Sequence, residues 1–220
     1  MKTAVRIFIF ACVAFAAGLN IFAQALDISS GGAPTITGAL SGSVTGSSSV
    51  QNDLSVTINF GEVSPSNINN IVRVVVPIAI RSNQPYTLQA AVTGATNANA
   101  QAIQRTDIGF GVNNFRSLGS RARVCTLSTH NFASPFNNDP GVTRTFDAGG
   151  RAAYPSTLNN LSVATTILTG PRLSDGNGTR QTNDGYAFDA IITITPQYYA
   201  FGSTTAVITF TISPGPLLPC

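Results

Sequence analysis

The sequence predicts an all-β protein built as an antiparallel β-sandwich with long loop insertions. Beyond residue 25, apolar residues recur at every second position in six separate segments, and no stretch shows the three-to-four-residue repeat of an amphipathic helix. Turn-forming sequences such as Ser-Asn-Gln-Pro and Asn-Asp-Gly separate these segments. Only 10% of the residues are charged, and serine, threonine and asparagine supply most of the polar surface. This composition is typical of a packed β-protein.

Residues 1–25 have the three parts of a signal peptide. Lys2 and Arg6 precede an apolar run of about a dozen residues, which is too short to span a bilayer. Ala-Gln-Ala at 23–25 then forms a small-x-small cleavage site. We expect cleavage after Ala25, export of the mature chain, and no membrane span after cleavage. The alternative is an uncleaved anchor helix.

Residues 26–52 form a segment rich in glycine, serine and threonine that is almost free of charge. Its apolar and small residues fall at alternate positions, which would place them on one face of a strand. These positions are Ile36, Gly38, Leu40, Gly42 and Val44. The pattern fits a donor strand that completes the sheet of another molecule. It also fits an internal first strand or a flexible linker, and we expect the sandwich domain itself to occupy residues 53–220.

The six alternating segments are residues 55–60, 71–80, 86–92, 161–168, 186–195 and 204–213. Each turns one set of apolar side chains toward a common core. Pro77 cannot donate a ladder hydrogen bond, so its strand is expected at a sheet edge or at a bulge. Seven of these residues are predicted to be buried in the core: Val56, Ile58, Leu88, Ile192, Ile194, Ile208 and Phe210.

Residues 93–160 interrupt this rhythm with asparagine, glycine, arginine and phenylalanine. We interpret the region as long connections and short strands at one end of the sandwich, with its phenylalanines filling local clusters. Those residues are Phe110, Phe115, Phe132, Phe136 and Phe146. The alternative is a carbohydrate-binding surface made by these loops, although the chain has no tryptophan to serve as a sugar platform.

Cys125 and Cys220 are the cysteines that remain once the signal peptide is removed. In an exported chain, an even pair predicts a disulfide. Cys125 also lies five residues before His130, the single histidine, which leaves open a nucleophile with its base. Two cysteines and one histidine fall short of a structural zinc site. His130 by itself is expected to be a loop residue.

No acid–base or metal constellation stands out. Asp175, Asn177 and Thr179 begin like a calcium loop, but Arg180 and Tyr186 occupy the positions that require glycine and glutamate. A glycine-rich hairpin loop is the other interpretation of this stretch. We expect Asp189 on the outer face of its strand, Glu62 in a turn, and Asp107 paired with Arg105 or Arg123.

The composition disfavours an enzyme and a nucleic-acid partner. The mature chain keeps ten arginines, nine acidic residues and no lysine, for a net charge of +1, so it has no basic surface for phosphates. No phosphate loop, nucleophile elbow or zinc-protease motif occurs. The sequence therefore predicts no enzymatic activity, no cofactor and no metal.

One family resemblance adds to this. The stretches Val-Thr-Ile-Asn-Phe-Gly-Glu-Val-Ser-Pro-Ser-Asn and Val-Arg-Val-Val-Val-Pro-Ile-Ala-Ile-Arg-Ser-Asn-Gln-Pro-Tyr-Thr-Leu resemble bacterial fimbrial subunits of the spore-coat-protein-U type. The matching positions are Phe60, Gly61, Pro65, Pro85, Tyr86 and Leu88. The resemblance implies an immunoglobulin-like, pilin-like sandwich in the bacterial periplasm, at the cell surface or outside the cell. It also implies assembly by donor-strand exchange.

Together these observations predict an exported structural or adhesive protein of the bacterial envelope, such as a pilus-like subunit. Its expected partners are further copies of itself or other envelope proteins. The alternative is a secreted carbohydrate-binding module that uses the loops of residues 93–160.

Overall fold

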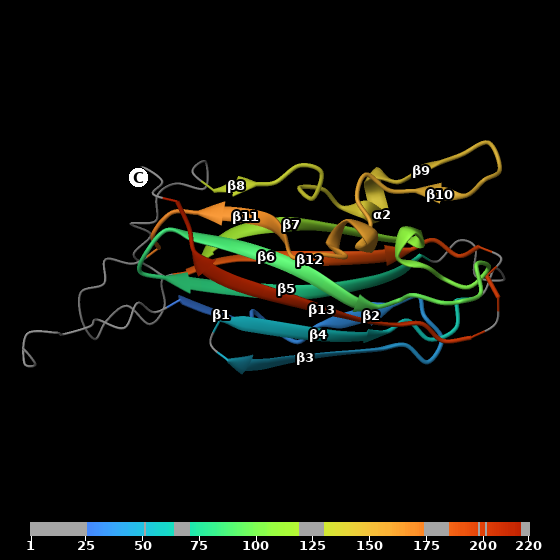
Figure 1. Ribbon diagram of the computed structural model, residues 1–220, viewed down its shortest axis with the longest axis horizontal. Helices are drawn as coiled ribbons and strands as arrows, with labels where there is room; N and C mark the ends of the chain where they lie inside the picture. The colour runs from blue at the N-terminus through green and yellow to red at the C-terminus, as the bar shows by residue number, and fades with distance from the viewer. Residues whose placement is uncertain are drawn as a thin grey trace, which may run out of the picture.

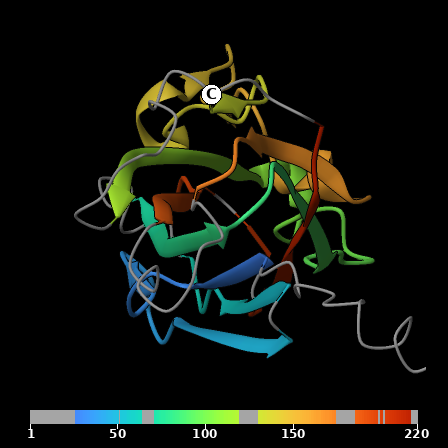
Figure 2. The ribbon, with the colours of Figure 1, turned by 90° about the vertical axis from the view of Figure 1, so that its left-hand side faces the viewer.

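Two antiparallel β-sheets face one another in the computed structural model (Figure 1). The structure describes residues 26–50, 52–63, 71–118, 130–173, 185–197, 199–200 and 202–216. Figure 2 looks along the strands from the left-hand end of Figure 1 and shows the layers. The prediction of an all-β sandwich is confirmed.

The first sheet is centred on β5 (Val72–Ser82) and is called the β5 sheet. On one side β5 pairs with β1 (Leu26–Ser30) and β2 (Thr35–Thr37), and on the other with β12 (Gly185–Ile194), which pairs with β7 (Ile108–Leu118). The second sheet, called the β13 sheet, has the order β3-β4-β13-β6-β11-β8. Its strands are β3 (Ser43–Val50), β4 (Asp53–Asn59), β13 (Thr205–Pro214), β6 (Tyr86–Gly94), β11 (Thr165–Gly170) and β8 (Asn131–Phe132).

Short elements decorate the sandwich. They are a hairpin of β9 (Thr145–Phe146) and β10 (Ala152–Ala153), the one-turn helix α2 (Pro140–Thr143), and the 3₁₀ turns η2 (Arg105–Asp107) and η4 (Leu158–Leu161). No helix in the described part of the chain is long and apolar enough to cross a membrane.

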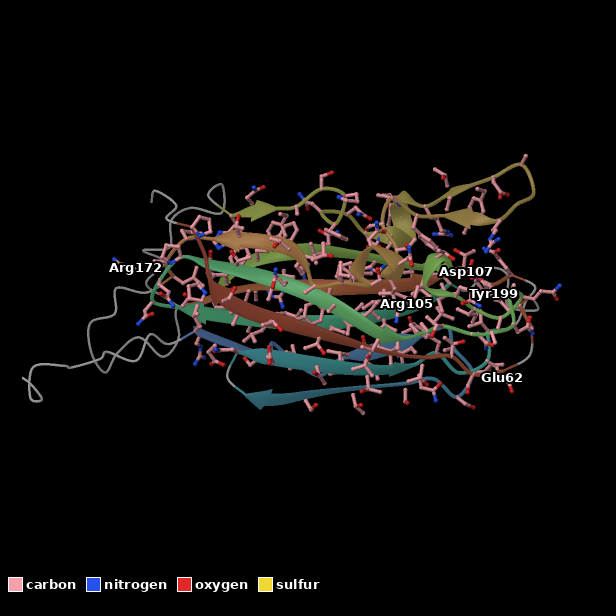
Figure 3. The ribbon with its side chains drawn as sticks, in the orientation of Figure 1. Glu62, Arg105, Asp107, Arg172 and Tyr199 are labelled. Atoms are coloured by element: carbon pink, nitrogen blue, oxygen red, sulfur yellow. The ribbon has the colours of Figure 1, made fainter. Side chains whose placement is uncertain are left out.

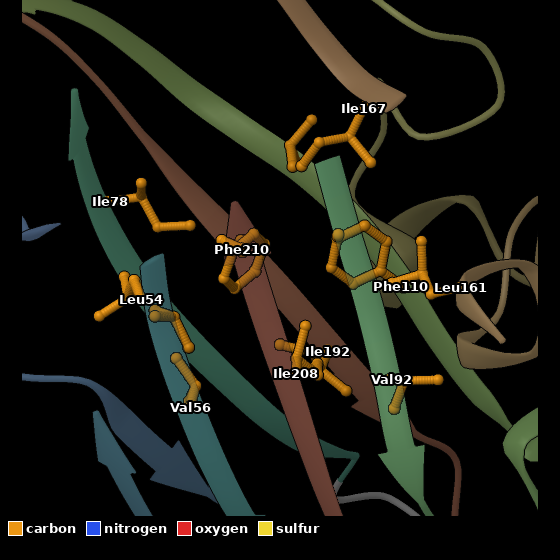
Figure 4. Packing of buried hydrophobic residues seen from close by; sticks show 14 of the residues in the cluster. Leu54, Val56, Ile78, Val92, Phe110, Leu161, Ile167, Ile192, Ile208 and Phe210 are labelled. Atoms are coloured by element: carbon orange, nitrogen blue, oxygen red, sulfur yellow. The ribbon is translucent and has the colours of Figure 1, made fainter. Parts of the chain in front are cut away.

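The core lies between the two sheets (Figure 4). Period-two alternation turns one side chain in two inward, and the rings of Phe110 on β7 and Phe210 on β13 meet across the gap at 6.5 Å between centroids. All seven residues that were predicted to be buried are 0% exposed. They are Val56, Ile58, Leu88, Ile192, Ile194, Ile208 and Phe210.

Pro77 does not mark an edge strand, because β5 is paired on both sides. Gly31 N–H donates to Pro77 O at 2.8 Å, so the backbone of Pro77 faces the β1–β2 side. Residues 31–34 separate β1 from β2 at this point, and the missing proline N–H therefore interrupts no continuous ladder. The expectation of an edge was wrong for this reason.

Residues 26–50 contribute strands to both sheets, whereas we expected the sandwich to begin at residue 53. β1 and β2 extend the β5 sheet, and the chain then crosses to the other layer, where β3 pairs with β4. The five alternating positions do not share a face of one strand. Ile36 and Val44 pack against the core from different sheets, while Leu40 lies in the crossover and is 53% exposed.

The segment expected as a strand over 161–168 is a strand only from Thr165 onward. Residues 158–161 form η4, in which Leu158 and Leu161 are buried, and Val163 is 71% exposed. The alternation of Leu161 and Val163 therefore came from a 3₁₀ turn followed by a bend and not from a pleated strand.

The outer face of β12 is covered at one end by residues 136–157. The carboxylate of Asp139 caps α2 by accepting from Gly141 N–H at 2.9 Å, and it forms a two-point ion pair with Arg73 on β5 at 2.8 and 2.6 Å. The same segment covers the free side of β7, where Phe110 N–H donates to Ser156 O and Val112 N–H donates to Phe136 O. Outward-facing Thr193 and Ile191 are buried as a result.

Candidate functional site

Several of the predicted features fall outside the described residues. These are the signal peptide of residues 1–25, the cysteines Cys125 and Cys220, and the calcium-like stretch that begins at Asp175. The disulfide and the cleavage site therefore stay predictions. No group of three or more metal-ligating side chains occurs among the residues that the structure describes.

His130 is buried and comes immediately before β8, which lies toward the left-hand end of the sandwich as drawn in Figure 1. Its ring stacks on Tyr186, with centroids 3.7 Å apart and planes 8° apart, and lies 6.1 Å from the ring of Tyr86. Neither ring nitrogen has a hydrogen-bond partner. Burial lowers the pKa of His130 from 6.5 to about 4, so at neutral pH it is an uncharged aromatic packing residue.

Asp189 lies on the outer face of β12, as expected. It forms an ion pair with Arg116 at 3.2 Å and accepts a hydrogen bond from the Asn114 amide at 2.7 Å. Glu62 is exposed beside a positive-φ glycine, Gly61, and its N–H donates to Leu40 O at 3.1 Å. Asp189 is therefore held in an ion pair, and Glu62 lies in a backbone bridge to Leu40.

Four of the five loop phenylalanines pack. Phe110 and Phe136 are buried edge to face, with centroids 5.8 Å apart, and Phe115 and Phe132 meet at 4.1 Å. Phe146 on β9 is 57% exposed, and the guanidinium of Arg144 lies 5.6 Å from its ring centroid. Packing therefore accounts for every one of these rings except Phe146.

The N-terminal arm, defined here as residues 26–37, supplies the outer edge of the β5 sheet. Ile28 is fully buried and stands opposite Ile80, and Leu26 is 6% exposed opposite Ser82. Among the strand pairings of the described residues, those of the arm are with β5 alone. It reaches β3 through a crossover of residues 38–42, which is fastened to Glu62 by the bond from its N–H to Leu40 O.

At the opposite end from His130 the sandwich has a pocket of about 550 Å³, called here the end pocket (Figure 3). Its walls come from residues 100–102 with Asp107, from residues 149–151, and from Pro196, Gln197 and Tyr199. These three stretches are far apart in the sequence. They meet because β6, β12 and the β9–β10 hairpin all end or turn at this end of the sheets.

Gln104 fixes the first wall. Its side-chain amide donates to Asn97 O at 3.0 Å and to Asn99 O at 2.9 Å, and its side-chain oxygen accepts from Asn97 N–H at 3.2 Å. Arg105 donates from Nε to Gly94 O at 2.8 Å. The loop that carries residues 100–102 is therefore held by local side-chain bonds, as asparagine-rich loops commonly are.

Asp107 and Arg151 join the first and second walls. The Asp107 carboxylate has a 4% exposed side chain, accepts from Arg151 at 2.5 Å and accepts from Gln104 N–H at 2.9 Å. Arg151 follows the turn of the β9–β10 hairpin, which Asp147 closes by accepting from the N–H groups of Gly149 and Arg151. The Arg151 side chain remains 59% exposed, and its bond to Asp107 raises its pKa further.

Tyr199 completes the third wall. Its hydroxyl is buried and has no hydrogen-bond partner, and burial followed by the nearby Asp107 charge raises the pKa of its phenol. The neighbouring residue Ala200 donates from its N–H to Gln101 O at 2.8 Å, which ties this wall to the first. Tyr154 shows the usual arrangement, since its hydroxyl bonds the Thr195 hydroxyl at 2.9 Å and accepts from Thr195 N–H at 2.8 Å.

The comparisons with known proteins are negative. No protein-family model matches the chain, and neither a curated protein nor a solved structure shows significant similarity to it.

The end pocket was only partly accessible to sequence reasoning. The partner of Asp107 was expected to be Arg105 or Arg123, but it is Arg151, which the β9–β10 hairpin brings close to it. Arg105 instead bonds a backbone carbonyl. Tyr199 follows Tyr198 in a loop whose only sequence signal was an aromatic pair between two strands.

Proposed function

We propose that the protein is an exported structural or adhesive module of the bacterial envelope, whose copies assemble by exchanging the N-terminal arm. The observation that carries the proposal is the placement of the arm. It provides the outermost strands of the β5 sheet and inserts Leu26 and Ile28 into the core, and a short crossover joins it to the remaining sandwich.

An exchanged arm would make the same contacts as a self-paired one. Its main-chain bonds would go to β5 of a neighbouring copy, and Ile28 would fill the same position opposite Ile80. A copy without its own arm would expose the unpaired backbone of β5, which is a template for strand addition. Repeated head-to-tail exchange would give an open chain of subunits.

The crossover favours release of the arm. Ser41 has a φ of 59° and is not a glycine, and a left-handed backbone costs such a residue about 1 to 2 kcal/mol. Exchange would extend this segment and let Ser41 relax. Leu40 is more than half exposed in the self-paired form, so movement of this one side chain on exchange takes little apolar surface out of the core.

The resemblance to fimbrial subunits supports the same conclusion. Phe60 is fully buried at the end of β4, and Gly61 follows with a φ of 62°. A Cβ on Gly61 would lie 2.1 Å from Leu40 O, so the Phe-Gly pair lets the crossover pass close to the end of this strand.

Mixed single-cysteine variants test the exchange directly. Ser29 and Ala79 are opposite one another on the outer face of β1 and β5, at a spacing that allows a disulfide. Mature Ser29→Cys and Ala79→Cys proteins would be unfolded together, refolded at high concentration and oxidised. The proposal predicts a disulfide-linked heterodimer between the two variants.

The matched control uses Thr45→Cys and Thr57→Cys, an exposed pair on β3 and β4. These strands form a hairpin with a short connection, so each remains with its own chain. Cross-linking of the first pair without the second supports exchange of the arm. Equal yields from both pairs, or none from the first, would contradict the proposal.

A further inference from the structure

We propose that the end pocket binds a neutral saccharide. This activity goes beyond assembly and depends on different residues, chiefly Gln101, Arg151, Gln197 and Tyr199. The pocket's volume of about 550 Å³ lies within the usual range for small-ligand sites, roughly 300 to 1,000 Å³.

The unpartnered hydroxyl of Tyr199 points to a polar ligand. A buried hydroxyl with no bond destabilises the folded protein, and proteins rarely keep one without a reason. By contrast, the hydroxyl of Tyr154 is fully hydrogen-bonded within the protein, through Thr195. Tyr199 forms part of the pocket wall, so a small rotation of its ring on binding would bring the buried hydroxyl to a ligand hydroxyl and remove this penalty.

The other polar groups of the pocket suit a ligand with many hydroxyls. Gln101 and Gln197 each carry a side-chain amide that both donates and accepts. Arg151 uses one of its N–H groups on Asp107 and is 59% exposed, which leaves further donors toward the open side. Ala100, Ala102 and Pro196 provide small apolar surfaces for the C–H faces of a sugar ring.

The charge balance favours a neutral ligand over an anion. The positive charge of Arg151 is already matched by the Asp107 carboxylate at 2.5 Å, and Asp147 acts on it as well. An added carboxylate or phosphate would face the negative charge of Asp107 with no second cation among the pocket residues. A neutral sugar meets no such repulsion.

The test is titration of the mature protein with four neutral disaccharides, namely lactose, cellobiose, maltose and N,N′-diacetylchitobiose, and with acidic sialyllactose. Binding would be followed by nuclear magnetic resonance up to about 20 mM ligand. The proposal predicts saturable binding of at least one neutral sugar, tighter than sialyllactose. Absence of binding by all four neutral sugars, or preference for sialyllactose, would overturn it.

Two tyrosine variants separate binding from folding. Tyr199→Phe removes a hydroxyl that has no partner in the free protein, so its Tm should stay equal or rise while Kd rises about three- to tenfold. Tyr154→Phe loses bonds to Thr195 outside the pocket, so its Tm should fall while Kd stays the same. An unchanged Kd in Tyr199→Phe, with binding still present, would overturn the assignment of the site.

Discussion

The burial of His130 makes stability depend on pH in a way that one substitution can remove. The ring lies against Tyr186 and near Tyr86, and neither nitrogen is bonded. Its folded pKa of about 4 lies below the ordinary 6.5, so the unfolded chain binds a proton first as the pH falls. The contribution of His130 is therefore complete above pH 6.5 and is lost as the pH falls through about 4.

The size of the effect follows from the two pKa values. Each unit of difference corresponds to 1.36 kcal/mol, so His130 should cost the native state about 3 kcal/mol at pH 4 relative to pH 7.5. The nearby phenols do not titrate in this window, because their ordinary pKa of 10 already lies above it, and burial raises the pKa of Tyr186 to about 12 and raises that of Tyr86 as well. His130→Phe keeps an aromatic ring on Tyr186 and removes the titrating group.

Urea unfolding between pH 7.5 and pH 4 measures this difference. We expect the wild-type free energy of unfolding to fall by about 3 kcal/mol more than that of His130→Phe. Because His130 is the only histidine, its ring proton resonances report its pKa in the unsubstituted protein as well. Parallel pH profiles for the two proteins, or a ring that titrates near 6.5, would refute the reasoning.

Three further predictions concern the arrangement of the loops and the chain ends. Asp139→Ala should destabilise the protein by about 2 to 3 kcal/mol at pH 7, measured by urea unfolding, because it removes the α2 cap and leaves Arg73 unpaired. Burial alone would raise the pKa of Asp139, but the bonds from Arg73 and Gly141 outweigh burial and lower this pKa below 3.8. The stability that Asp139 contributes should therefore persist down to about pH 4 and be lost as the pH falls through the lowered pKa. Gly38→Ala should lower the free energy of unfolding by more than about 2 kcal/mol, because φ at residue 38 is 78° and the new Cβ would lie 2.2 Å from Ile71 O. The control Gly46→Ala on β3, where a Cβ meets no atom within 4 Å, should change it by less than about 0.5 kcal/mol in the same assay. Thiol titration of the denatured, unreduced mature protein should find Cys125 and Cys220 bonded, and two free thiols would contradict the pairing.

Alternation was enough to predict the core strands. In residues 55–60, 86–92 and 204–213 every second side chain is apolar, and a sheet with one buried face requires that pattern. The same reasoning failed at Leu161 and Val163, because a 3₁₀ turn can imitate two positions of a strand. It also failed at Pro77, since the interruption of the ladder there comes from residues 31–34, which are far from Pro77 in the sequence.

The pocket was less accessible because it depends on contacts between distant loops. Nothing near Asp107 in the sequence identifies Arg151 as its partner. The β9–β10 hairpin brings the two side chains together, and each of its strands has only two residues. The sequence likewise does not show that the Tyr199 hydroxyl lacks a hydrogen-bond partner, because its surroundings come from three stretches of chain that meet only in the folded protein. For the arm, the sequence predicted a strand-forming segment but not the crossover that divides it between two sheets.

The most direct test of the proposed assembly is the mass distribution of the mature protein after refolding at increasing concentration. Sedimentation velocity would be compared with that of Ser41→Gly, which removes the backbone cost of the φ of 59° in the self-paired form. Assembly by arm exchange predicts a concentration-dependent series of integer multiples of the monomer mass in the unsubstituted protein. The series should be weaker in Ser41→Gly, because the self-paired monomer no longer carries that cost, and the monomer's Tm should not fall. A single monomeric species at every concentration would contradict assembly through the arm.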